Sequence, residues 1–125
     1  MSKELMQQVF TKMQTEMNTA HRHTQKGELI EAEAIYHKML EQQENYPPAL
    51  HGLSDLADKI DEQDVREDLL QRAIDQIQGA TDRNQKGLIA IWLAERAEAL
   101  IKLGRQDDAK GCISESERII KENLA

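Results

Sequence analysis

Apolar residues recur along most of the chain at alternating intervals of three and four positions, the spacing of one face of an α-helix. The first run, in residues 3–25, forms a single stripe made of Met6, Phe10, Met13, Met17 and Ala20. This stripe predicts a long helix with one buried face, although methionines also suit an adaptable surface for a partner helix. Similar runs continue to residue 123, and none shows the alternation of a strand. The pattern therefore predicts an all-α protein.

Breaks in the pattern divide the chain into about six helices. Gly27 and Gly104 end helical runs, because glycine readily takes the left-handed conformation that closes a helix C-terminus. A further helix begins at Pro47 and Pro48, since proline is tolerated in a first turn. We expect one domain over residues 1–125, with helical hairpins at about residues 3–44, 47–78 and 85–123.

The residues that follow each turn glycine add a second pattern. Gly27 is followed five positions later by Ala32, and Gly104 is followed at the same distance by Ala109, each with larger apolar residues beyond. This pattern resembles the tetratricopeptide repeat, a helix–turn–helix unit of about 34 residues. In the middle unit Asp61 stands at the turn position and Arg66 at the small position. The third unit arrives late, which places extra residues in the loop 79–84 or in a longer fourth helix.

The resemblance implies a fold and a binding surface. Units of this family stack as a short solenoid and present the first helix of each hairpin along a concave groove. By this likeness the groove-lining residues are Gln14, Met17, His21, Thr24, His51, Asp55, Asp58, Ala94, Glu98 and Lys102. Three of them, Asp55, Asp58 and Glu98, would make part of the groove acidic, which favours a basic ligand.

Composition narrows the classes of partner. The net charge is −7 and only 3% of the residues are aromatic, whereas a nucleic-acid-binding surface combines a basic stripe with stacking aromatic side chains. No run is apolar and long enough for a membrane span or a signal peptide. We therefore expect neither a nucleic-acid nor a membrane partner, and a cytoplasmic location.

The sequence offers no recognisable catalytic or metal-binding motif. Cys112 is the only cysteine, so a thiolate zinc cluster is excluded. His21 and His23 are two positions apart on a helix and point in different directions, while His37 and His51 fall on other helices. Glycine-rich phosphate loops and the local motifs of nucleophilic enzymes are also missing. We expect no catalytic residues, no metal and no cofactor, and hence no enzyme.

The function expected from these observations is a non-enzymatic adaptor or chaperone-like module that binds a peptide or helix of another protein. A second hypothesis is a structural unit that assembles copies of the chain, with a homodimer as the expected state. It follows from the sixth helix, whose apolar side around Cys112 and Ile119 has no following helix to cover it. A third hypothesis is a helical regulatory subunit or a small enzyme.

Overall fold

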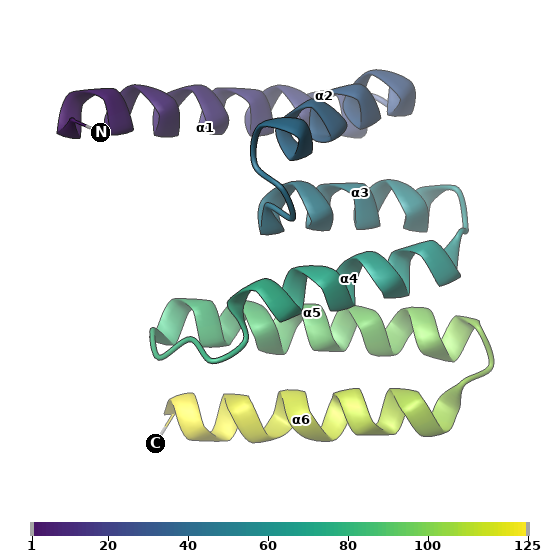
Figure 1. Cartoon of the computed structure of the whole chain (residues 1–125). Coiled ribbons are helices and arrows are strands. Elements are labelled where there is room, and N and C mark those ends of the chain that lie inside the picture. The colour runs from purple at the N-terminus through teal and green to yellow at the C-terminus, as the bar shows by residue number, and fades with distance from the viewer. Residues whose placement is uncertain (1, 125) are drawn as a thin grey trace.

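The computed structural model describes residues 2–124, which form six α-helices and no strand within that range (Figure 1). The helices are α1 (Lys3–Gln25), α2 (Leu29–Gln42), α3 (Pro47–Lys59), α4 (Gln63–Ile77), α5 (Arg83–Lys102) and α6 (Gln106–Leu124). Each helix packs against the next, and α1 also contacts α3. The described chain is therefore a stack of helical hairpins, and the predicted all-α class is confirmed.

The three hairpins turn in the same way. Gly27, Asp61 and Gly104 all take the left-handed conformation, with φ of 79°, 56° and 78°. The residue after each of them donates its backbone N–H to the carbonyl five positions earlier, over 2.9, 2.8 and 2.8 Å. Such bonds satisfy carbonyls that a helix C-terminus leaves free. The equivalent turns at residues 27, 61 and 104 show that the hairpin is an internal structural repeat.

The extra residues of the third hairpin lie mainly in α5. This helix has 20 residues, whereas α3, its counterpart in the second hairpin, has 13. Asp82 begins α5 by accepting the backbone N–H of Gln85 through its side chain, at 3.3 Å. The expected position of the insertion, in the loop 79–84 or in a longer fourth helix, is therefore wrong, because α5 begins at Arg83.

Small residues allow the helices to approach closely. Ala20, Ala32 and Ala109 are almost fully buried at crossings within the hairpins. Gly52 of α3 serves the same purpose against α2, because a Cβ at this position would overlap the ring of Tyr36. The large fully buried side chains of the core are Met39, Leu50, Leu70, Ile74 and Leu100.

The N-terminal half of α1 is exposed, which corrects the predicted buried stripe. Met6 and Phe10 are 58% and 61% exposed, and only from Met13 onward does the stripe pack against the core. The physical reason is length: α1 has 23 residues and α2 only 14, so α1 is longer by about 13 Å at the 1.5 Å rise of a helix. Figure 1 shows the N-terminal half of α1 extending beyond α2.

The buried face of α6 also differs from the expectation. Cys112 and Ile119, which were expected to lie uncovered, are buried against the rest of the fold, whereas Ile113 and Ile120 are exposed. Both pairs fit a helical period, so the sequence pattern alone does not choose between them. The rotation of α6 is set in part by Ser116, whose hydroxyl is buried and donates to the carbonyl of Ala90 at 2.8 Å.

Candidate functional site

A pocket of about 540 Å³ opens between α1, α3 and α5. We call it the α3–α5 pocket. The residues that line it are Met17, Tyr46, Pro47, Pro48, His51, Ile77, Gln85, Leu88, Ile91, Trp92 and Glu95. Most of these side chains are apolar, and the two that can carry charge, His51 and Glu95, come from facing helices. The pocket can therefore accept an apolar group that lies beside a charged one.

The insertion in α5 builds one wall of this pocket. Counted back from the equivalent turns at 61 and 104, the first seven residues of α5 precede any counterpart in α3. Gln85 and Leu88 lie in this extra part, and Ile91 and Trp92 follow directly. The start of α3 at Pro47 and Met17 of α1 lie across from them. The pocket thus results from the unequal lengths of the first helices of the hairpins.

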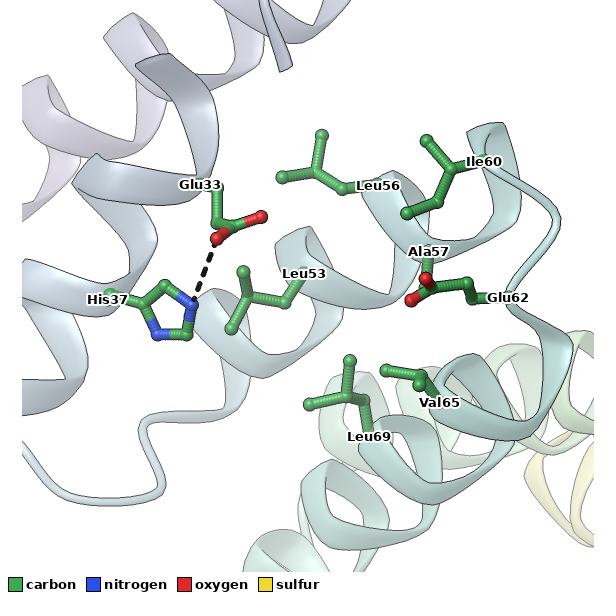
Figure 2. Close-up of a pocket in the computed structure, with 9 residues that line it drawn as sticks. All are labelled: Glu33, His37, Leu53, Leu56, Ala57, Ile60, Glu62, Val65 and Leu69. Carbon is green, nitrogen blue, oxygen red and sulfur yellow. Dashed lines mark ion pairs between the residues drawn. The ribbon is translucent and has the colours of Figure 1, made fainter. Parts of the chain in front are cut away.

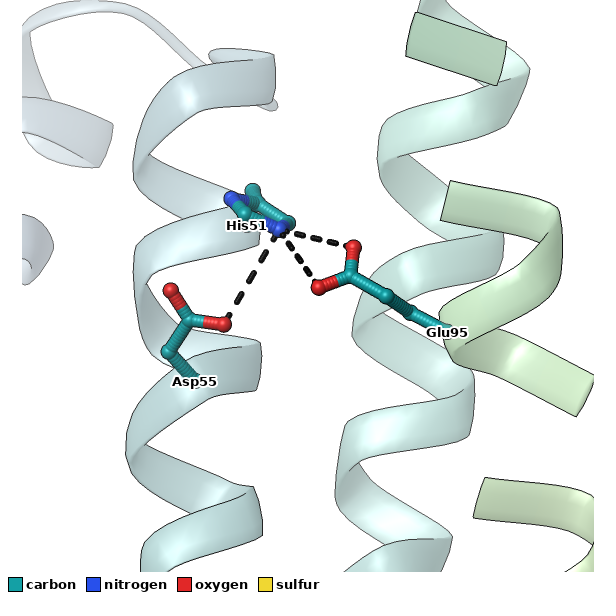
Figure 3. Close-up of side chains that lie close together, drawn as sticks. All are labelled: His51, Asp55 and Glu95. Carbon is teal, nitrogen blue, oxygen red and sulfur yellow. Dashed lines mark hydrogen bonds and ion pairs between the residues drawn. The ribbon is translucent and has the colours of Figure 1, made fainter. Parts of the chain in front are cut away.

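One corner of the pocket carries a cluster of three titratable side chains (Figure 3). His51 and Asp55 lie one turn apart on α3, so both point from the same face of the helix. Nε2 of His51 donates to Oε2 of Glu95 on α5 at 2.9 Å and lies 3.9 Å from Oδ1 of Asp55. The imidazole ring also stacks on Trp92, with ring centres 5.3 Å apart and planes 21° apart. The stack and the hydrogen bond together fix the orientation of His51.

The cluster shifts the ionisation of two of its members. Burial acts to lower the pKa of His51, but the hydrogen bond that His51 donates to Glu95 and the charges of Asp55 and Glu95 outweigh it, so the pKa is raised. The pKa of Asp55 is also raised, chiefly by burial; His51 opposes the shift and the charge of Glu95 adds to it. Two carboxylates therefore share one imidazole in a half-buried corner.

A second charge cluster lies beside the first and is internally balanced. Arg66 of α4 has a side chain only 6% exposed and donates to Glu98 at 2.9 Å and to Asp58 at 3.4 Å. Lys102 pairs with Asp58 at 3.3 Å and with Glu98 at 3.4 Å. The hydrogen bond from Gln63, with help from Arg66 and Lys102, lowers the pKa of Asp58. The hydrogen bond from Arg66 is the main cause that lowers the pKa of Glu98.

The structure therefore distributes the predicted groove residues among different surroundings. Met17 and His51 line the α3–α5 pocket, and Asp55 lies beside His51. Asp58, Glu98 and Lys102 meet around Arg66, so the carboxylates that were expected to make the groove acidic are largely neutralised. Ala94 borders a groove between α5 and α6 that Glu95 and Glu98 also line. The remaining predicted residues lie apart from these clusters: Gln14 and His21 are exposed, and Thr24 is buried, with its hydroxyl donating to the carbonyl of Ala20.

One member of the titratable cluster, Glu95, was not predicted from the sequence. The sequence does not distinguish Glu95 from the many other carboxylates on the polar faces of helices. The spacing of His51 and Asp55, four positions apart on one helix, was a usable signal. The sequence carried no such signal for Glu95, the partner across the pocket. Glu95 is 44 positions away from His51, and its approach depends on how α3 and α5 pack on α4.

Two further hollows border the same helices. A groove of about 360 Å³ lies between α5 and α6 and shares Ile91 and Glu95 with the α3–α5 pocket. A smaller pocket of about 200 Å³ lies between α2, α3 and α4 (Figure 2). Leu53, Ile60 and other apolar side chains line that pocket. It also holds the exposed pair His37 and Glu33, with Nε2 and Oε1 3.7 Å apart.

A comparison of the sequence with models of known protein families gives no match, and a comparison with curated proteins gives none either. Among residues 2–124, no helix combines the length and the apolar content that crossing a membrane requires. Function is therefore argued from the site itself.

Proposed function

We propose that the chain is a protein-interaction module, and that its α3–α5 pocket binds an apolar side chain from a peptide or helix of a partner protein. In this proposal a lysine or arginine of the same segment binds Asp55 and Glu95. The observation that carries it is the position of an apolar pocket directly beside two carboxylates. Binding sites commonly combine a concave apolar wall with a few oriented polar groups.

Charge at the pocket supports a basic ligand. In the described residues, Asp55 and Glu95 form ion pairs only with His51, which carries at most one positive charge. The neighbouring cation Arg66 is already shared by two other carboxylates. At least one negative charge is therefore left over at the pocket. A lysine or arginine complements it, and such complementarity speeds encounter and fixes the register of a bound segment.

Exposed apolar surface next to the pocket supports a ligand larger than one side chain. Leu88 and Ile91 lie on the accessible side of α5, and Ile91 is 57% exposed. Ile91 also borders the groove between α5 and α6, so the apolar surface continues from one hollow into the next. The likeness of the hairpins to tetratricopeptide repeats supports the same choice, because the pocket is built mainly by first helices of hairpins.

Selection of peptides from a random display library against the whole chain tests the proposal. The selected peptides should share a bulky apolar residue close to a lysine or arginine. Their affinity should fall by more than about fivefold for Ile91→Asp and for Glu95→Gln, the loss that corresponds to removing 1 kcal/mol of binding energy. The preference for a basic residue should weaken only in Glu95→Gln.

A matched control lies on the other side of α3. Ile60 is 53% exposed and lines the small pocket of Figure 2, so Ile60→Asp adds the same charge to an apolar position of similar exposure. This variant should bind the selected peptides like the unchanged chain. The proposed site would be contradicted if the selected peptides bound Ile91→Asp as tightly as the unchanged chain. A loss of binding confined to Ile60→Asp would contradict it too.

The exposed stripe on α1 favours a second candidate function, self-association. Leu5, Met6, Val9 and Phe10 are all exposed, although such a stripe is usually covered. By helical spacing Lys3 and Lys12 flank this stripe on either side. The α1 of a second copy thus carries the two features that the α3–α5 pocket fits, apolar side chains and cations.

Sedimentation across a range of concentrations tests this candidate. The unchanged chain should form dimers as its concentration rises, and Phe10→Ser should remain monomeric at the same concentrations. Ile30→Ser is the control, because Ile30 is an exposed isoleucine on α2. A chain that stays monomeric throughout, or a dimer that Phe10→Ser leaves intact, would contradict self-association through α1.

A further inference from the structure

We propose that His51, Asp55 and Glu95 form a binding site for a divalent transition-metal ion of the zinc type. The three side chains offer one imidazole nitrogen and two carboxylate oxygens, and these ligand atoms lie within 4.8 Å of one another (Figure 3). Within residues 2–124 no other set of three histidine, cysteine or carboxylate side chains meets this closely.

The distances suit a small metal ion. Zinc lies about 2.0–2.2 Å from nitrogen and oxygen ligands, so two ligands of a tetrahedral site are about 3.3–3.6 Å apart. Nε2 of His51 lies 2.9 Å from Glu95 and 3.9 Å from Asp55, which brackets this separation. Metal binding would require the Asp55 carboxylate, now 3.9 Å from Nε2 of His51, to move slightly closer. The ion then takes the position of the proton that His51 shares with Glu95.

The ligands are presented by well-supported helices. His51 and Asp55 lie one turn apart on α3, a spacing that directs two side chains to the same point. Glu95 comes from α5, and both helices pack on α4. The ring of His51 is held against the buried Trp92. The imidazole ligand is therefore already oriented before the ion binds, which favours affinity.

The ligand set selects among metals. Calcium takes six to eight oxygen ligands and magnesium an octahedron of oxygens, so neither is well matched by three groups that include an imidazole. One nitrogen and two carboxylate oxygens suit zinc and similar first-row ions. Three protein ligands also leave a coordination position for water or a bound group. All three side chains are half-buried, which leaves the ion a path from solvent.

The charge balance of the cluster also favours a divalent cation. The corner holds two carboxylates and one imidazole, and a divalent cation neutralises both negative charges. A metal ion and a lysine of a bound segment would therefore compete for the same carboxylates. The metal site does not depend on the proposed function, and its test needs no partner protein.

Calorimetric titration of the chelator-treated chain with Zn²⁺ alone tests the site. One ion should bind per chain. The dissociation constant should rise by more than about tenfold in both His51→Ala and Glu95→Gln, because even outer-shell substitutions weaken metal sites by about 10–100-fold. Titration with Co²⁺ should give a visible absorption spectrum, and Glu95→Gln should change that spectrum. Such a change reports direct coordination by Glu95 rather than a shift in the stability of the fold.

Two controls keep the outcome decisive. His37→Ala removes another histidine that lies one turn from a carboxylate, Glu33, but on an exposed surface without a third ligand. It should leave the dissociation constant unchanged. Circular dichroism checks the fold of each variant, and Asp55→Asn, at a more exposed position, replaces any variant that does not fold. The proposal would be overturned if the unchanged chain bound no Zn²⁺. It would also be overturned if His37→Ala and Glu95→Gln lost affinity equally, since the binding would then be that of an adventitious ion only.

Discussion

Replacing Gly52 with alanine should destabilise the chain, although alanine is the better helix former. In a helix interior this change normally stabilises a protein by about 0.5–1 kcal/mol. At Gly52 the new Cβ would overlap three atoms of the Tyr36 ring, and Tyr36 is 3% exposed in the core between α2 and α3. Overpacking of a dense core costs about 1–3 kcal/mol. The free energy of unfolding should therefore fall by about 1–2 kcal/mol.

Urea unfolding followed by circular dichroism measures this effect. Gly111→Ala is the matched control, because Gly111 lies inside α6 and a Cβ there would meet no side chain and no other helix within 4 Å. It should raise the free energy of unfolding by about 0.5–1 kcal/mol. The two substitutions are thus expected to differ in sign. A Gly52→Ala chain as stable as Gly111→Ala would show that α2 and α3 do not approach as closely as described here.

Glu16→Leu should raise the free energy of unfolding by about 1 kcal/mol, because both carboxylate oxygens of Glu16 are buried without a hydrogen-bond partner in the described residues; an unchanged urea midpoint would contradict this. Ala109→Leu should lower it by about 1–3 kcal/mol through overpacking against α5, whereas Lys110→Gln should leave it unchanged. The stabilisation from Asp58 and Glu98 should be present near neutral pH and disappear as the pH falls through their lowered pKa values. The midpoint difference between the unchanged chain and the double variant Asp58→Asn, Glu98→Gln should therefore shrink from about pH 7 to about pH 3, and a constant difference would contradict it.

Much of the fold followed from the sequence because local signals and packing agree. Gly27, Gly104 and the proline pair at 47–48 lie where the structure ends or begins helices. Asp61 was expected to stand in for a turn glycine, and it takes the same left-handed conformation. The sequence did not show how far a stripe is covered, because the burial of α1 depends on the lengths of its neighbours.

The candidate site was predictable only in part. Met17, His51 and Asp55 were expected on the binding surface from their places in the repeat, and the structure brings them to one pocket or its edge. The charge of that surface was not predictable, because Arg66 stands where the repeat favours a small residue and its long side chain reaches Asp58 and Glu98. The resulting neutralisation leaves Asp55 and Glu95 as the acidic groups beside the pocket.

The most direct test of the proposed binding surface is a titration of isotope-labelled chain with a selected peptide, followed through the backbone amide resonances. The largest shift changes are expected in residues 49–55 of α3 and 85–95 of α5, around the α3–α5 pocket. Shift changes concentrated instead in α2 and α4, around the small pocket of Figure 2, would contradict the proposed function.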